Sequence, residues 1–534
     1  MKKKLCFLMV FVLLLSLLSG CGANKSSQTT KSSETPSQLV IPVDSEFMAG
    51  NILNMGGGPT GSLIYEGLVT KNRQGSYDAW LAKNWKSTEN GKIWKFNLVE
   101  NAKWHDGVPF TSEDVKFTYD YAKEKKIMIL SYLPMTVDHV ETPDKYTVVF
   151  FLKSSNPAFL DHLSHCPGIP IIPKHIWENI NDPEHYEDKQ YVGTGPFKYE
   201  NRIPGDMVKL VANQDYHGNK PHIKEIVLKV IKNKDAQILA LKSGTVDVVC
   251  GISQAVANSL KDNKKIVVYN IPSTNGYELG FNVNKYPTNM IKFRKAMEYA
   301  IDKDKICKIV FGGNAKPANT FLMPEVAHDY VKTDIRKYEF NLKKCKDLLN
   351  EAGFVENNGV LEGPDKKKVQ ITIPTGGKAG SVDNNLAEVI KNDWTQLGID
   401  VKIKQVDFNQ WFNEVHKNEV FFVGMPWLMH DDPDDLSHFG SKSFFGKDNW
   451  YGYSNNEYDQ LIKQLQNTTN KEDRKKIAYQ MQDILARDIP SIPICVSDTV
   501  VAYRSDKFTG WKETYPMYWS VVDIKQLLKV RPVK

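Results

Sequence analysis

The sequence predicts an α/β protein without a single uninterrupted parallel sheet. Short segments that alternate apolar and polar residues, as strands do, recur along the chain between segments with helix signals. Several helical segments end at a glycine, so the units are short and separate. The chain has 534 residues, of which 41% are hydrophobic and 25% charged. This balance is typical of globular proteins, and the length allows about three domains.

The first unit is a strand, a turn and a helix. Residues 94–98 alternate apolar and polar side chains, which indicates a half-buried strand. Asp106 and Gly107 form a turn signal. Residues 111–114, Thr-Ser-Glu-Asp, have the pattern of a capping box and precede an apolar helical run.

Later units repeat this alternation. Residues 226–231 predict a strand, 235–242 a helix closed by Gly244, and 246–249 another strand. Two further helices are expected to end at Gly353 and at Gly398. Ile399, Val401 and Ile403 then alternate with charged residues as in a strand.

The N-terminus has the pattern of a bacterial lipoprotein signal peptide over residues 1–20. Three lysines precede an apolar stretch, residues 5–18, that is too short for a comfortable transmembrane helix. Leu18-Ser19-Gly20-Cys21 follows, so we expect lipid attachment at Cys21. The alternative is an ordinary secretory signal with a chance cysteine. Residues 21–37 are then a lipidated cysteine and a Ser/Thr-rich flexible tether, which would keep the protein on the extracytoplasmic face of the cell membrane.

Composition excludes several classes of protein. The chain carries 69 Lys and Arg against 63 Asp and Glu. Its net charge of +6 is too small for its length to indicate a nucleic-acid-binding face. No stretch after the first twenty residues is apolar enough to cross a bilayer, which excludes an integral channel. Five cysteines remain beyond Cys21, without tight spacing, so neither a disulfide scaffold nor a structural zinc site is expected.

Motifs for catalysis or for a cofactor are weak. Residues 56–61 spell G-x-G-x-x-G, but no convincing strand precedes them, and we interpret them as a mobile or cleft-lining loop. The chain has no nucleophile elbow and no H-E-x-x-H pair. We therefore expect no enzyme and no cofactor.

Two histidine-containing segments remain as candidate sites. His162 and His165 are three residues apart and could share a helix face and a metal ion, or lie in a polar loop. The second segment, residues 427–435, is rich in carboxylates. Asp432 is expected to cap a helix, Pro433 to occupy its first position, and Asp434 and Asp435 to meet its positive end.

That helix start leaves Trp427, His430 and Asp431 without a structural task. An aromatic ring beside a carboxylate at a helix entrance is suited to binding a cation or an amine. We therefore predict that these three residues bind ligand.

At this point the chain resembles the large extracellular solute-binding proteins of ABC importers, the oligopeptide-, dipeptide- and nickel-binding family (family 5). The matching segments follow one another along the mature chain: 94–98, 104–115, 193–197, 213–221, 244–247, 281–282, 294–302, 351–354 and 489–493.

The resemblance implies a two-lobed fold of the periplasmic-binding-protein type, with ligand enclosed between hinge-linked lobes. The first lobe would comprise residues 38–72, 193–283 and 497–534, the inserted small domain 73–192, and the second lobe 284–496. It also implies an ABC permease as partner, and we expect a monomer.

The cargo implied by the resemblance is a short peptide, with a nickel-type metal complex as the alternative. Peptide-binding relatives often place an Asp three positions after the tryptophan, and here that position is His430. Nickel-binding relatives use arginines in the middle-domain loop, and the matching loop has His162, His165 and Lys174 instead. The runner-up metal ligands are therefore His162, His165 and His430. A secreted metal-dependent hydrolase using His430, Asp431 and His438 is a remote third hypothesis.

Overall fold

The computed structural model describes fourteen stretches of the chain: 37–44, 51–53, 61–72, 76–127, 132–164, 169–322, 327–376, 381–407, 410–411, 417, 419–424, 432–442, 449–511 and 524–533. Within them, no helix is both long and apolar enough to cross a membrane. The expected signal peptide, residues 21–36 of the tether and residues 56–60 of the glycine-rich motif lie outside the described residues, whereas Gly61, expected in the loop, begins helix α2.

A four-stranded sheet opens the described chain. Its order is β1 (Gln38–Val43), β10 (Glu225–Val230), β9 (Met207–Ala212) and β8 (Phe197–Ile203). β1 pairs parallel to β10, while β10, β9 and β8 pair antiparallel. Leu39 and Ile41 on β1 are buried, as are Ile226 and Leu228 on β10, so one face of this sheet packs on the core.

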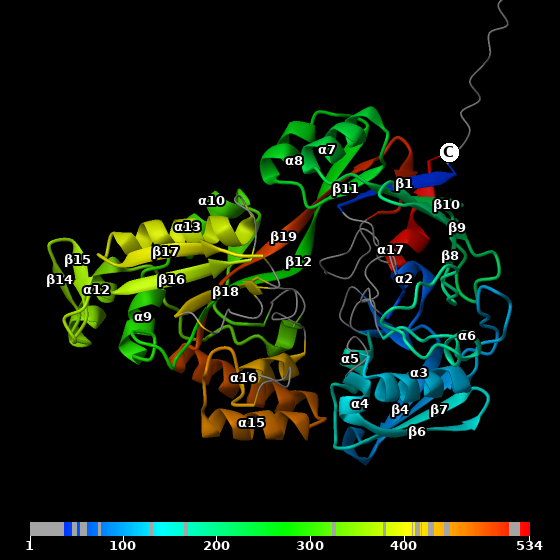
Figure 1. The fold of residues 1–534 in the computed structure, drawn as a ribbon, viewed down its shortest axis with the longest axis horizontal. Helices are drawn as coiled ribbons and strands as arrows, with labels where there is room; N and C mark the ends of the chain where they lie inside the picture. Colours follow the sequence, from blue (N-terminus) through cyan, green and yellow to red (C-terminus); the bar gives the residue numbers. More distant parts are fainter. Residues whose placement is uncertain are drawn as a thin grey trace, which may run out of the picture. The chain divides into compact units, whose positions relative to one another are not determined.

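The predicted strand–turn–helix unit is confirmed within a second, antiparallel sheet. That sheet has the order β4 (Ala82–Thr88), β5 (Ile93–Leu98), β7 (Thr147–Leu152) and β6 (Val137–Asp144). On β5, Trp94, Phe96 and Leu98 are buried and Lys95 is exposed. Helix α3 (Ser112–Lys125) begins at the capping box, where the Thr111 amide donates to Asp114 Oδ2 at 2.9 Å, and it packs against β6 and β7 (Figure 1).

Two long antiparallel strands run side by side through the middle of the molecule (Figure 1). They are β12 (Ile266–Phe281) and β19 (Ser491–Arg504), and the same sheet contains β11 (Val248–Cys250), β18 (Val420–Gly424) and β13 (Ala315–Pro317). Their register shifts twice, between Ile271 and Asn275 and again between Tyr277 and Glu278. Such irregularities interrupt the ladder and bend a strand locally.

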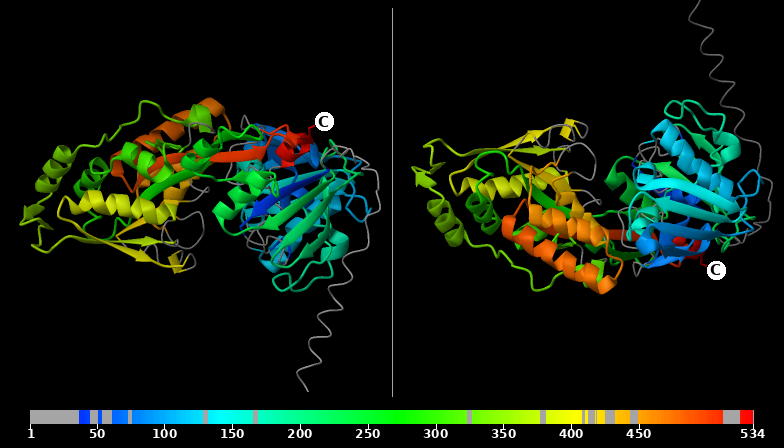
Figure 2. Two further views of the ribbon diagram at one scale, coloured as in Figure 1. Left: turned by 90° about the horizontal axis from the view of Figure 1, so that it is seen from above. Right: turned by 90° about the horizontal axis from the view of Figure 1, so that it is seen from below.

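Beyond the second shift, the chain forms an α/β layer. Strands β16 (Gln370–Thr375) and β17 (Asp400–Gln405) pair parallel and carry α13 (Val382–Thr395). The helix expected to end at Gly398 is α13, and the alternating strand expected after it is β17, so both predictions are confirmed. Figure 2 (right) shows α15 (Asn456–Gln466) and α16 (Lys471–Asp488), in orange, packed side by side.

The remaining elements are short. The strands are β2 (Val69–Lys71), β3 (Tyr77–Ala79), β14 (Val355–Asn357), β15 (Val360–Glu362), β20 (Phe508–Thr509) and β21 (Arg531–Pro532). The helices are α2 (Gly61–Ile64), α4 (Tyr132–Thr136), α5 (Phe159–Ser164), α6 (Lys174–Trp177), α7 (Lys234–Ser243), α8 (Gln254–Leu260), α9 (Ile291–Tyr299), α10 (Lys303–Phe311), α12 (Leu342–Glu351) and α17 (Ile524–Lys529). The 3-10 turns are η1 (Glu89–Gly91), η3 (His328–Tyr330) and η5 (Pro433–Phe439).

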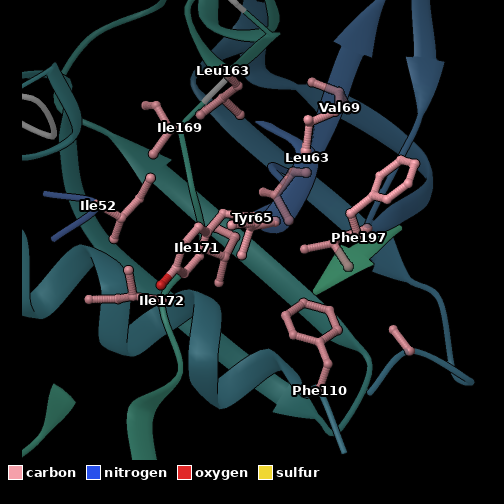
Figure 3. Packing of buried hydrophobic residues seen from close by; sticks show 14 of the residues in the cluster. Ile52, Leu63, Tyr65, Val69, Phe110, Leu163, Ile169, Ile171, Ile172 and Phe197 are labelled. Atoms are coloured by element: carbon pink, nitrogen blue, oxygen red, sulfur yellow. The ribbon is translucent and has the colours of Figure 1, made fainter. Parts of the chain in front are cut away.

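The hydrophobic core divides into two regions, which we call the first region and the second region. The first region contains the clusters drawn from residues 39–271 and 500–530, part of which is shown in Figure 3. The second region contains the clusters drawn from residues 279–495. β12 and β19 contribute buried residues to both, so these two strands connect the two regions.

Candidate functional site

The residues that the sequence predicts as ligand-binding, Trp427, His430 and Asp431, lie outside the described residues, as do His165 and Cys21. Both flanks of the segment are described. On one side β18 ends at Gly424, which pairs with Tyr277 at the second register shift of β12. On the other side η5 begins after Asp432. The segment thus begins at the end of β18, which pairs with the connecting strand β12, and it ends at the capped helical turn η5.

The predicted start of this turn is confirmed in its capping. Asp432 is the N-cap, its Oδ1 accepts from the Asp434 amide at 2.8 Å, and Pro433 occupies the first position. The element that follows is a 3-10 helix of seven residues rather than an α-helix. Its weaker backbone hydrogen bonding makes side-chain anchoring more important here.

That anchoring comes from Arg474 on α16, which sequence reasoning did not single out. Its guanidinium is buried and donates to Asp432 Oδ1 at 2.5 Å and to the Leu465 carbonyl at 3.0 Å. The pair is charge-assisted and shielded from water, which strengthens it. Arg474 therefore fixes the cap that ends the candidate ligand segment.

Asp434 lies in the first turn of η5, as predicted, and also has a partner that the sequence did not indicate. It is buried, and its Oδ2 lies 3.7 Å from Nε2 of His162 on α5, a residue of the first region. Its Oδ1 accepts from the Ser437 hydroxyl at 3.2 Å. Burial raises the pKa of Asp434, but the hydrogen bond and charge of His162 and the charge of Arg474 lower it below its usual value.

A second buried ion pair precedes His162 directly. The ammonium of Lys71 on β2 contacts Asp161 on α5, and both side chains are almost completely buried. The two residues are far apart in the sequence, and neither belongs to a short motif, so no local signal could have paired them. This ion pair orients the helix that presents His162 toward Asp434.

The described residues therefore form a charged cluster contributed by both regions: Lys71, Asp161 and His162 from the first, and Asp432, Asp434 and Arg474 from the second. Among the stretches that the structure describes, no three His, Cys, Asp or Glu side chains gather to hold a metal ion. The cluster pairs opposite charges and provides no nucleophile with an adjacent base. Its arrangement is therefore suited to holding and positioning a polar ligand.

The structure has two core regions that a pair of strands connects, and charged groups of both regions meet beside a capped turn. This arrangement is typical of the class of two-lobed binding proteins. The family model for bacterial extracellular solute-binding proteins, family 5, matches residues 76–450. The chain belongs to this family of solute-binding proteins of ABC importers, and the resemblance predicted from its motifs is confirmed.

Individual relatives match along nearly the whole chain. The oligopeptide-binding protein AppA of Bacillus subtilis is 27% identical over 510 residues, which cover 92% of each chain. Its solved structure in complex with a nonapeptide has a TM-score of 0.78, at 24% identity over 94% of this chain and 99% of that one. NikZ from Campylobacter jejuni, solved with Ni(L-His), has a TM-score of 0.77 at 25% identity over 91% of this chain and 99% of that one.

These matches confirm the two-lobed, periplasmic-binding-protein fold class. The family consists of binding components of importers, and the curated relatives are binding proteins. The chain is therefore a binding protein and not an enzyme, which removes the hydrolase hypothesis built on His430, Asp431 and His438.

Proposed function

We propose that this protein captures short peptides between its two lobes and delivers them to an ABC permease. The observation that carries the proposal is the similarity to an oligopeptide-binding protein over 92% of both chains. The lobes are those of the sequence interpretation: 38–72, 193–283 and 497–534 for the first, with 73–192 inserted, and 284–496 for the second.

The two connecting strands support hinge closure. Both register shifts of β12 against β19 fall between the first and second core regions. A ladder interrupted at this point resists bending less than a continuous one. Rotation at residues 271–278 would bring the lobes onto a peptide, and closure would desolvate it.

Trp427, His430 and Asp431 are the proposed peptide contacts. Asp431 would accept the peptide's α-ammonium, since an unpaired charge in a closed cleft is costly. Trp427 would lie along the peptide. His430 replaces the usual carboxylate and would soften the interaction with an ammonium.

A nickel-type metal complex is the alternative cargo. The specific observation in its favour is His162, which faces Asp434 beside the candidate segment. A chelate could take His162, His165 and His430 as ligands, since imidazole suits nickel. The fold match to NikZ with Ni(L-His) is equally consistent with this cargo.

The experiment that separates these cargoes is native mass spectrometry of freshly purified protein, run beside metal analysis after dialysis. We expect a spread of peptide masses and no stoichiometric metal. A single metal-containing mass would replace the peptide proposal with the metal one. Protein that stays empty after incubation with a peptide library and with nickel–histidine would contradict both.

Membrane attachment through Cys21 is a separate part of the proposal. The thiol would carry lipid, and residues 22–37 would tether a monomeric body at the extracytoplasmic face of the membrane. Cys21→Ala should release the protein into the medium or leave its precursor unprocessed, as detergent partitioning and intact mass would show. Wild-type partitioning of the processed variant would refute the anchor.

A further inference from the structure

Two cysteines far apart in the sequence lie together in the core of the second region. Cys307 is on α10 and is 5% exposed, while Cys495 is on β19 and is completely buried. Both belong to one hydrophobic cluster, and α10 packs against β19. The structure holds both as thiols.

The helix face that carries Cys307 is fixed against the strand by a neighbouring lysine. Lys303 lies one turn before Cys307, so the two side chains share a face of α10. Its ammonium donates to the Ala318 carbonyl at 3.0 Å, and the Ala318 amide donates to the carbonyl of Ile494 at 3.0 Å. This chain of hydrogen bonds ends at the residue beside Cys495.

The two thiols interact directly. The Cys495 thiol donates a hydrogen bond to the Cys307 sulfur, which lowers the pKa of Cys307. The same hydrogen bond, together with burial, raises the pKa of Cys495. Cys307 is therefore the thiol that ionises first, and a thiolate is the reactive form.

We propose that Cys307 and Cys495 form a redox-sensitive disulfide that cross-links α10 to the connecting strand β19. The family is extracellular, a compartment in which disulfides form and persist. The oxidant is a low-molecular-weight disulfide such as oxidised glutathione or cystine.

Exchange proceeds in two steps that balance. The Cys307 thiolate attacks one sulfur of the small disulfide, forms a mixed disulfide and expels one small thiolate. Cys495 then loses its proton to that thiolate and attacks the Cys307 sulfur, which expels the second small thiolate, and this thiolate takes up the proton that Cys307 had released. Two protein thiols are oxidised by two electrons, and one small disulfide is reduced to two thiols.

The test uses the full-length protein equilibrated in glutathione buffers of increasing oxidised fraction. Samples are quenched with acid, alkylated in denaturant and digested with trypsin without reduction. We expect the tryptic peptides 306–308 and 488–504 to be recovered linked, and the intact mass to fall by two hydrogens. The melting temperature should rise by a few degrees, because the cross-link restricts the unfolded chain.

Two sets of outcomes decide the proposal. Cys345→Ser removes another buried thiol of the same cluster and should leave the link intact, whereas Cys307→Ser and Cys495→Ser should each abolish it. Wild-type protein in which both cysteines remain open to alkylation in the most oxidising buffer would overturn the proposal. So would mixed glutathione adducts at Cys307 without the link, or a link to Cys250 or Cys345. The decisive measurement is on wild type, so a variant that fails to fold changes nothing.

Discussion

The buried carboxylates Asp161 and Glu278, one in each of the regions that β12 and β19 connect, have different partners. In the first region Asp161 contacts the Lys71 ammonium, and Glu66 accepts hydrogen bonds from the Tyr216 hydroxyl at 2.8 Å and His217 Nε2 at 3.0 Å. In the second region Glu278, on β12 at the second register shift, is hydrogen-bonded by the Tyr451 hydroxyl.

The consequence appears in the protonation of Glu278. Burial raises its pKa to about 7, and the neutral groups that bond to it offset only part of that change. A neutral partner satisfies a hydrogen bond but does not compensate a buried charge. Asp161 is thus paired with a cation, as Asp432 of the second region is with Arg474, whereas Glu278 is a protonatable carboxyl at the place where the connecting strands are irregular.

The largest effect is expected from breaking a pair in the first region. Lys71→Met leaves Asp161 as a buried charge without its cation and should lower the free energy of unfolding by about 3–5 kcal/mol. Urea denaturation would measure it. The matched control is Lys83→Met, which removes an exposed pair with Glu100 and should cost less than about 0.5 kcal/mol. Equal losses in the two variants would contradict the comparison.

The next effect should have the opposite sign. Below about pH 4.5 the carboxyl of Glu278 is protonated in both folded and unfolded chains. As pH rises, the unfolded chain loses this proton first and the folded protein keeps it until about pH 7, so stability falls across this window. Glu278→Gln removes the loss and should raise the free energy of unfolding by up to about 3 kcal/mol near pH 8, with little change near pH 4.

The same substitution in the first region provides the contrast. Glu66→Gln replaces a carboxylate oxygen that accepts from Tyr216 or His217 by an amide nitrogen that cannot accept, so it should destabilise the protein near pH 8. Denaturation of both variants at the two pH values would decide the point. A Glu278→Gln variant that loses stability at the higher pH would contradict the raised pKa of Glu278.

A smaller effect is expected at the proposed cleft. Asp431 would gain a cationic partner only when peptide is bound, and would then resemble Asp161. Asp431→Asn should weaken peptide affinity by roughly tenfold, about 1.4 kcal/mol, and leave the melting temperature of the empty protein unchanged. Calorimetric titration with the peptides found by mass spectrometry measures it. Unchanged affinity would remove Asp431 from the site.

The smallest effect should come from the contact between the regions. His162→Gln keeps a hydrogen-bonding group beside Asp434 but removes the imidazole, and should change peptide affinity by less than about 1 kcal/mol. Titration of this variant with peptide and with nickel–histidine would also test the alternative cargo. A selective loss of nickel–histidine binding would favour the metal complex.

Local signals in the sequence predicted much of the fold. The capping box at Thr111 and the glycines after α7 and α12 depend on neighbours within a few residues, and the structure has them where they were expected. The alternation in β5 and β17 likewise reports a face of a sheet.

The charged cluster of the site could not be predicted in this way. Asp434 has the sequence position of a helix-dipole partner, and only the tertiary fold buries it beside His162. Lys71 with Asp161 and Cys307 with Cys495 are pairs that long-range packing creates between residues with no shared motif. The division into lobes came from the family resemblance, because no composition rule marks where β12 leaves one core for the other.

The first described strand has a mechanical consequence for a tethered protein. Ser37, at the point where the chain reaches β1, accepts hydrogen bonds from the amides of Lys224 and Glu225 at 3.0 and 3.1 Å. Any tension carried along the N-terminal chain is therefore applied first to these two bonds and then to the six residue pairs of β1 and β10. A pull along β1 loads these bonds together in shear, whereas a pull across the sheet would peel them one at a time. In a protein anchored as proposed at Cys21, we therefore expect this edge strand to yield first under load.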